Sequence, residues 1–152
     1  CSGGIGGEVP RINPERNLTM YRALTSAMSQ GLVRSAHDCS DGGLATALAE
    51  CCFGADSGAR VDIEGMWGDC ESLDRWGALF GESLGRILVS VRPSDREAFE
   101  KAMREHACHH LGEVSDTDGI YITKGDKWVL SASMTELRQS WKGALDGGGA
   151  HQ

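Results

Sequence analysis

The chain has 152 residues, of which 40% are hydrophobic and 24% are charged, which is typical of one globular domain with a single modest core and excludes disordered, collagen-like and coiled-coil proteins. Its formal net charge is −7, so a nucleic-acid backbone would be repelled and no nucleic-acid partner is expected. No apolar segment approaches the roughly 20 residues that span a bilayer, and no signal-peptide pattern opens the chain. We therefore expect a cytoplasmic protein with no membrane partner.

The cysteines fit neither a disulfide framework nor a zinc site, because no C-x-x-C pair occurs among them. Cys51 and Cys52 lie in an apolar helical pattern, where a free thiol behaves as a small hydrophobic group. Reduced thiols are the expected state. The chain begins at Cys1 and not at a methionine, which suggests a piece of a longer protein.

The first half of the chain predicts two helices after a glycine-rich opening. Residues 1–12 are expected to form a linker or docking strap. Asn13-Pro14 provides an N-cap followed by proline at the first helical position, and Gly31 ends the pattern, so a helix is predicted over 14–31. Its apolar face is marked by Leu18, Tyr21, Leu24, Met28 and Leu32. A second helix is predicted from Leu44 to Cys52.

The second half predicts several strands and two further helices. Short strands are expected at 60–63, 111–115, 119–123 and 127–131, and a central strand at 86–91; residues 64–81 predict a loop and a short helix. Capping boxes at Ser94–Glu97 and Ser133–Glu136 predict the starts of two helices. The order of elements indicates an α+β domain over residues 13–146, with helices packed on a mixed β-sheet, followed by a flexible tail at 147–152.

The first candidate site is the polar segment that precedes the second helix. It contains His37, Asp38, Ser40, Asp41, Gly42 and Gly43. Ser40 or Asp41 could cap the helix, and the free N–H groups of a helix start could bind a phosphate or a neighbouring backbone. The alternative is that Asp41 itself fills the helix start. An acid–base pair of His37 and Asp38 is not expected, because adjacent residues in a strand point to opposite faces.

The second candidate site is the entrance to the strand at 86–91, where Glu82, Ser83 and Arg86 lie. A carboxylate, a hydroxyl and a guanidinium could orient a polar ligand or a metal-bound phosphate. The alternative, which we favour from the residues alone, is an ion pair of Glu82 with Arg86 that fixes the loop to the sheet.

Two apparent metal motifs are rejected. His106, Cys108, His109 and His110 offer zinc donors but lack a second ligand pair. The segment 116–119 begins like a calcium loop, yet Lys127 stands where its closing glutamate would be. No metal site is expected in this chain.

The motifs together resemble one family. Residues 35–50, which include Ser35-Ala36-His37-Asp38-Cys39-Ser40-Asp41-Gly42-Gly43-Leu44, look like the C-terminal part of phosphoribosylformylglycinamidine synthase, in the synthetase subunit of its small bacterial form. Leu79-Phe80-Gly81-Glu82-Ser83 with Gly85-Arg86 is similar to a second signature of that family. The segments 112–114 and 137–145 resemble its closing part, and the likeness runs from about Gly6 to Leu145.

The resemblance implies a fold like the C-terminal domain of aminoimidazole ribonucleotide (AIR) synthase. It also implies a role in purine biosynthesis, in which ATP and magnesium activate formylglycinamide ribonucleotide for attack by ammonia. The implied partners are the remaining domains of the synthetase, a glutamine amidotransferase that delivers the ammonia, and small accessory subunits. This chain matches only the last of four domains, so it is expected to hold no catalytic residue, to bind no cofactor tightly and to be inactive alone.

Leu84 departs from the Glu-Ser-Gln pattern that touches substrate in the other half of the family, so this copy of the site is expected to be structural. The alternatives are a non-catalytic ligand-binding or assembly module of the same superfamily, and a domain of a related enzyme such as selenophosphate synthetase.

Two structural expectations follow from the resemblance. An exposed apolar patch is expected around the opening strap and Gly42-Gly43, with Trp67 or Trp76 as anchors. A β-branched residue at Gly43 is expected to impair assembly of the intact enzyme more than folding.

Overall fold

The computed structural model describes residues 12–67 and 75–145, and it divides the chain into two compact units. The first unit comprises residues 1–41 and 82–108, and the second comprises residues 42–81 and 109–152. The chain passes between the units after residues 41, 81 and 108. The expected strap and tail lie outside the described residues, apart from Ile12 of the strap.

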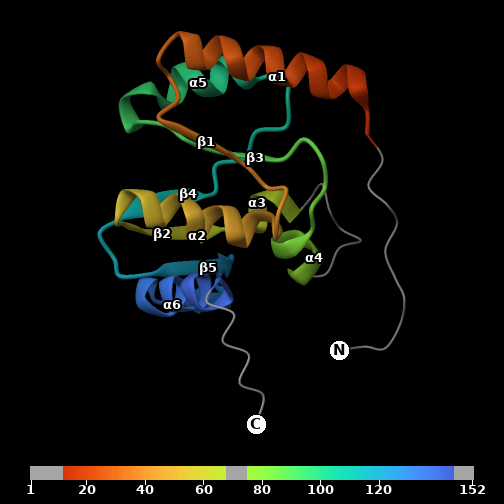
Figure 1. The fold of residues 1–152 in the computed structure, drawn as a ribbon. Helices are drawn as coiled ribbons and strands as arrows, with labels where there is room; N and C mark the ends of the chain where they lie inside the picture. Colours follow the sequence, from red (N-terminus) through yellow and green to blue (C-terminus); the bar gives the residue numbers. More distant parts are fainter. Residues whose placement is uncertain (1–11, 68–74, 146–152) are drawn as a thin grey trace. The chain divides into compact units, whose positions relative to one another are not determined.

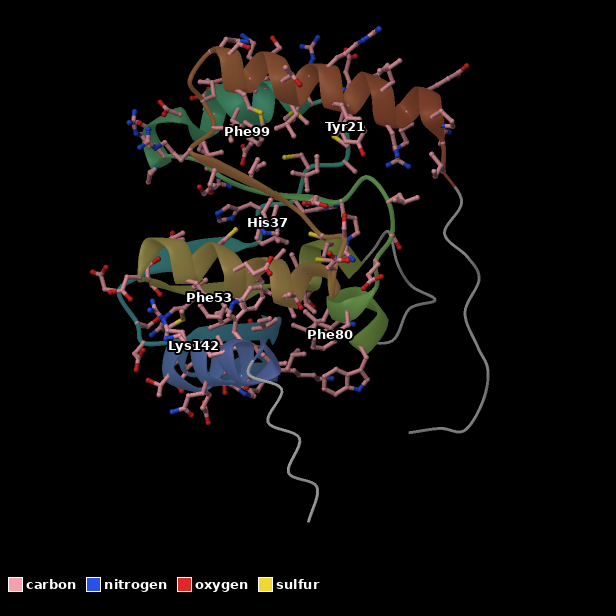
Figure 2. All side chains as sticks on the ribbon, viewed as in Figure 1. Tyr21, His37, Phe53, Phe80, Phe99 and Lys142 are labelled. Carbon is pink, nitrogen blue, oxygen red and sulfur yellow. The ribbon has the colours of Figure 1, made fainter. Side chains whose placement is uncertain are left out.

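The described part of the first unit contains two helices, a 3-10 turn and a pair of strands. Its elements are α1 (Pro14–Ser29), β1 (Ser35–Asp38), β3 (Ile87–Ser90), η1 (Pro93–Asp95) and α5 (Arg96–Met103). In Figure 1, α1 runs alongside α5. Leu24 and Ala27 of α1 are buried against Phe99 and Met103 of α5, and Figure 2 labels Phe99 in this core.

Helix α1 begins where the sequence predicts, but it ends at Ser29 and not at Gly31, and a different side of it is buried. The Asn13 side chain accepts a hydrogen bond from the Arg16 N–H at 3.0 Å, and Pro14 occupies the first turn. Of the predicted apolar face, Leu24 is buried, whereas Leu18, Tyr21 and Met28 are exposed. The small and flexible side chains at 20, 23 and 27 face the core instead, because they allow α5 to approach closely.

The strand predicted at the centre of a sheet belongs to a two-stranded sheet. Among the described residues, β3 pairs only with β1, antiparallel, with His37 opposite Leu88 and Asp38 opposite Ile87. All four residues of β3 are half-buried. The apolar run misled the prediction because Ile87, Val89 and Val91 pack on the α1–α5 core.

The second unit is built on a four-stranded sheet in the order β4-β2-β5-β6. Its strands are β2 (Gly58–Asp62), β4 (Gly112–Ser115), β5 (Ile120–Lys124) and β6 (Lys127–Ala132). β2 pairs parallel with β5, and the β2–β4 and β5–β6 pairs are antiparallel. The predicted α+β class with a mixed sheet is confirmed.

Among its described residues, the second unit also contains four helices. They are α2 (Gly43–Ala55), α3 (Glu64–Trp67), α4 (Arg75–Phe80) and α6 (Met134–Leu145). α2 contacts β2, α4 and α6, and Figure 1 shows it running along β2. Phe53 of α2 meets Trp141 of α6 edge to face at 5.8 Å between ring centroids. Asp56, just after α2, forms a 2.6 Å ion pair with Arg138 of α6.

Of the two predicted capping boxes, one is confirmed and one is wrong. At α6 the Glu136 carboxylate accepts from the Ser133 backbone N–H, which is the main reason why the pKa of Glu136 lies below its ordinary value. The Ser133 hydroxyl accepts from the Glu136 N–H at 3.2 Å, which completes the box. At α5 no side chain caps the helix. Pro93 starts a 3-10 turn there, and Asp95 and not Ser94 occupies the cap position.

Candidate functional site

A pocket of about 420 Å³ lies in the first unit, where β1 ends and β3 begins. The backbone brings its two sides together, because the Cys39 N–H donates to the Arg86 carbonyl at 3.0 Å just beyond the Asp38–Ile87 pair. The two polar segments singled out in the sequence are thereby joined in space, although about forty residues separate them in the chain. The lining residues are Tyr21, Asp38, Cys39, Ser40, Asp41, Glu82, Ser83, Leu84, Gly85, Arg86 and Ile87.

Six of the nine candidate site residues line this pocket, and three do not. Those inside are Asp38, Ser40, Asp41, Glu82, Ser83 and Arg86. His37 lies one residue before the pocket, and its Nδ1 is 2.6 Å from the Asp38 carbonyl oxygen. Gly42 and Gly43 belong to the second unit.

The pocket is rich in oxygen donors and negative in charge. The Ser40 hydroxyl donates to Oδ2 of Asp38, and this bond is the main reason why the pKa of the Asp38 carboxyl lies below its ordinary value. With Asp41 and Glu82, the lining carries three carboxylates against the one guanidinium of Arg86. Such a lining attracts a cation, or a phosphate whose charge is already neutralised by a metal ion.

The start of α2 differs from the prediction. Gly42 is the N-cap, with φ of +74°, and no side chain caps the helix. The expectation that Ser40 or Asp41 would do so is wrong for a geometric reason: Gly42 takes the cap position, and the Ser40 hydroxyl turns back to Asp38.

Gly43 is held tightly within the second unit. Its φ is +70°, and a Cβ atom placed there would lie 2.7 Å from the Leu79 carbonyl oxygen and 2.8 Å from the Phe80 carbonyl carbon. The glycine therefore allows α2 to approach the end of α4, which is an internal packing role. Nearby on α4, Trp76 and Phe80 are stacked and exposed, at 6.1 Å between ring centroids. This agrees with the expected apolar patch; the side chain of Trp67 lies outside the described residues.

Sequence reasoning missed the contribution of α1 to the pocket. Tyr21 lines it and is 42% exposed, but its spacing in the sequence assigned it only to an apolar helix face. Leu84, noted as a departure from the family pattern, lines the same pocket and is 56% exposed. No local signal links Tyr21 to residues 82–86, because helix α1 and strand β3 meet only in the folded unit.

The described residues contain free thiols, but neither a metal-binding cluster nor a membrane-spanning helix. Over residues 12–67 and 75–145, no three His, Cys, Asp or Glu side chains lie close enough to hold a metal ion. The cysteines of this part of the chain, Cys39, Cys51, Cys52 and Cys108, are free, and burial raises the pKa of the Cys51 and Cys52 thiols. None of the described helices has the length and apolar character needed to cross a membrane.

Comparison with solved structures shows the same fold in two kinds of protein. The chain superposes on phosphoribosylformylglycinamidine synthase II from Thermotoga maritima with a TM-score of 0.77 and 21% identity, covering 85% of this chain and 22% of that one. The T. maritima PurLQS structure gives a TM-score of 0.78 and 20% identity, covering 86% of this chain and 23% of that one. The hydrogenase maturation protein HypE gives a TM-score of 0.59 and 18% identity, covering 76% of this chain and 41% of HypE. The chain thus spans about a fifth of the synthase chains that it matches.

A family sequence model matches residues 2–125, which include both polar segments of the pocket. Its description is AIR synthase related protein, C-terminal domain. The match covers most of the chain and agrees with the mixed sheet and helices described above. The chain belongs to the family of AIR synthase related proteins, as their C-terminal domain.

Proposed function

We propose that the chain is the C-terminal domain of a phosphoribosylformylglycinamidine synthase, an ATP-dependent enzyme that converts formylglycinamide ribonucleotide and ammonia to the amidine in purine biosynthesis. The observation that carries the proposal is the meeting of the family's two polar signatures at one pocket of the first unit. Family membership and the superposition on T. maritima synthase structures support it.

The proposal includes ATP and magnesium as cofactors of the intact enzyme. Relatives of the same fold are described as complexed with ATP, with ADP and with FGAR. The pocket suits a magnesium-bound phosphate better than a bare one, because its carboxylates outnumber its guanidinium. In that role Arg86 would bind a phosphate oxygen, and Ser83 would donate a hydrogen bond. Ser40 would hold the Asp38 carboxylate through the hydrogen bond described above, and the carboxylates would face the metal side.

The proposed partners are the other domains of the synthetase, a glutamine amidotransferase and small accessory subunits, in the cytoplasm. The similarity to the T. maritima PurLQS structure supports a multi-subunit assembly. Exposed apolar side chains on the first unit, among them Leu18, Tyr21 and Leu84, are suited to contact a neighbouring domain.

The test compares the isolated chain with the intact enzyme. Phosphate release from ATP is measured with formylglycinamide ribonucleotide and ammonia. The 152-residue chain alone is expected to show no turnover, and the intact enzyme is expected to turn over. Arg86→Gln in the intact enzyme is expected to lower kcat/KM about tenfold or more, since a charged hydrogen bond to phosphate contributes about 1.5–3 kcal/mol.

Arg104→Gln is the matched control, because Arg104 follows α5 in the same unit, is highly exposed and does not line the pocket. It is expected to leave kcat/KM unchanged. Turnover by the isolated chain, or equal effects of the two arginine changes, would contradict the proposal.

A further inference from the structure

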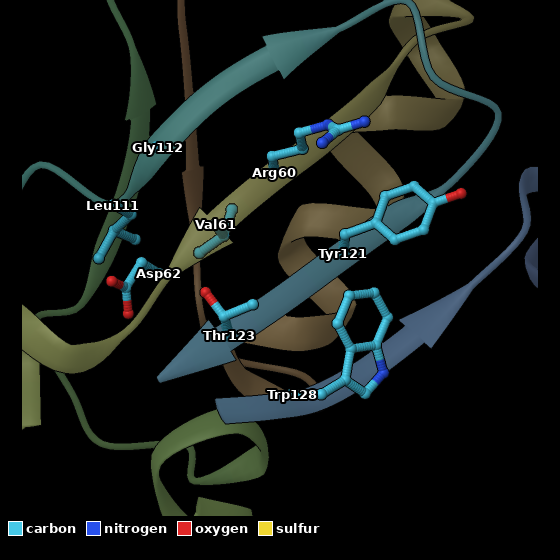
Figure 3. A pocket seen from close by; sticks show the side chains of 8 residues that line it. All are labelled: Arg60, Val61, Asp62, Leu111, Gly112, Tyr121, Thr123 and Trp128. Atoms are coloured by element: carbon cyan, nitrogen blue, oxygen red, sulfur yellow. The ribbon is translucent and has the colours of Figure 1, made fainter. Parts of the chain in front are cut away.

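A second pocket, of about 530 Å³, lies on the sheet of the second unit (Figure 3). Along β2 the buried residues Ala59 and Val61 alternate with the exposed Arg60 and Asp62. Along β5 the buried Ile120 and Ile122 alternate with the half-buried Tyr121 and Thr123. The outward set lines the pocket together with Trp128 of β6. None of these residues was singled out by the sequence motifs, and none belongs to the pocket of the first unit.

The strand register places a carboxylate and an indole on either side of a small residue. Asp62 pairs with Thr123, and Thr123 pairs with Trp128, so the three form one row across β2, β5 and β6. Neighbouring strands are about 4.8 Å apart, so the backbones of Asp62 and Trp128 are separated by about 10 Å. Because Thr123 is short, the space above it is open, and Figure 3 shows its side chain between the other two.

The Asp62 carboxylate is held in position by backbone N–H groups, and only one of its two oxygens accepts hydrogen bonds from the described residues. Its Oδ1 accepts the backbone N–H groups of Glu64 and of Gly125, both at 2.9 Å. Oδ2 has no hydrogen-bond partner within the part of the chain that the structure describes. A rigid acceptor with unused capacity is a favourable partner for a cationic donor, because no side-chain entropy has to be lost on binding.

Tyr121 and Trp128 hold each other in position beside Asp62, and the Trp128 ring is partly exposed. Tyr121 and Trp128 meet edge to face, with ring centroids 5.8 Å apart and planes at 65°. The Arg60 guanidinium lies over the Tyr121 ring, 5.7 Å from its centroid. Trp128 is nevertheless 58% exposed. An indole face beside a carboxylate is the combination that binds flat organic cations, by cation–π attraction and charge-assisted hydrogen bonds.

The charge of the whole chain favours a cation over an anion. The two charged groups that line the pocket, Arg60 and Asp62, balance each other, and Arg60 is opposed on β4 by Glu113 in the strand register. The whole chain carries −7. An anionic ligand would have to overcome this field, whereas a cation is attracted by it.

We propose that this pocket binds a guanidinium cation, with the planar group stacked on Trp128 and its N–H groups donating to Asp62. The ligand can be a small guanidinium compound or the arginine side chain of a polypeptide, since both present the same group. The site is separate from the proposed synthetase function and does not depend on it.

The test uses the 152-residue chain and agmatine as the probe. The indole N–H signal of Trp128, assigned by its loss in Trp128→Phe, is followed by NMR during titration. Agmatine is expected to shift this signal while the signals of Trp76 and Trp141 stay in place. Asp62→Asn keeps the oxygen that accepts from the Glu64 and Gly125 N–H groups but removes the negative charge. It is expected to weaken agmatine binding about tenfold.

Glu113→Gln is the matched control, because it removes a carboxylate from the same face without touching the pocket lining. It is expected to change the affinity less than twofold. A parallel titration with 1,4-diaminobutane, which carries the same two positive charges as agmatine but no guanidinium group, separates a guanidinium site from a general cation site. A peptide acetyl-Gly-Arg-Gly-amide that binds where agmatine does not would assign the site to a polypeptide arginine.

The proposal is overturned if neither agmatine nor the peptide shifts the Trp128 signal. It is also overturned if 1,4-diaminobutane binds as well as agmatine, or if Glu113→Gln weakens binding as much as Asp62→Asn. Circular dichroism of the two carboxylate variants must match that of the unchanged chain, and tryptophan signals other than that of Trp128 report on the fold in the same spectra.

Discussion

At the scale of single residues, Gly43 and Gly54 differ although both belong to helix α2. Gly43 has φ of +70° and faces the backbone at the end of α4, whereas a Cβ at Gly54 would have no atom within 4 Å. The sequence indicated that Gly43 faces a partner, because two adjacent glycines at a helix start are typical of a close approach. The close approach exists, but its partner is the chain itself.

We predict that Gly43→Val destabilises the isolated chain by about 3 kcal/mol or more. A left-handed conformation costs about 1–2 kcal/mol for a residue with a Cβ atom, and overpacking against fixed backbone adds about 1–3 kcal/mol. Gly54→Ala, the control, is expected to stabilise α2 by about 0.5–1 kcal/mol. Urea unfolding measures both. A Gly43→Val chain as stable as the unchanged protein would restore the interpretation that this glycine serves only assembly.

At the scale of elements, the sequence predicts that α1 and β3 form, but it does not predict which side of each is buried. Helical periodicity fixes which residues share a face, but two overlapping faces of α1 are apolar, and the larger side chains lie on the exposed one. In β3 a continuous apolar run predicted burial between strands, yet the strand is covered by helices on one side. Local sequence specifies the element, and its neighbour decides which side is covered.

We predict that Leu24→Ala lowers the free energy of unfolding by about 2–5 kcal/mol, the usual cost of removing a buried leucine side chain. Met28→Ala, on the exposed face, is expected to change it by less than about 0.5 kcal/mol. Thermal and urea unfolding of both variants give the comparison. Equal losses would show that the sequence-predicted face, and not the observed one, is buried in solution.

At the scale of the whole molecule, the chain forms two units whose residues are interleaved along the sequence. Each unit has its own buried side chains: Leu24 and Phe99 in the first, Ile63, Leu79 and Ile122 in the second. A local loss of packing is therefore expected to spread first within one unit.

We predict that Leu24→Ala accelerates amide hydrogen exchange in α1 and α5 more than in β5, and that Ile122→Ala does the reverse. Under mildly destabilising conditions, exchange measured by NMR or mass spectrometry should separate the two groups of amides. A uniform loss of protection over residues 12–67 and 75–145 in either variant would mean that the two units unfold as one.

Two of the helix starts, one of the strands and most of the pocket residues could be predicted from the sequence, because the interactions that specify them join residues close together in the chain. Asn13-Pro14 specifies the start of α1, and Ser133 with Glu136 specifies the start of α6, since caps involve residues only three positions apart. Alternation of polar and apolar residues from Arg60 to Ile63 predicts a strand that overlaps β2. The two polar segments also identified the family, and most of their side chains line the pocket of the first unit.

The tertiary structure decided the rest, because those features depend on residues far apart in the chain. The place of Tyr21 beside residues 82–86, the pairing of β3 with β1 and the contact of Gly43 with Leu79 are all of this kind. So is the row of Asp62, Thr123 and Trp128, which exists only through strand register. Periodicity and capping act over a few residues, whereas the choice of neighbour is made by burial and packing summed over a whole unit.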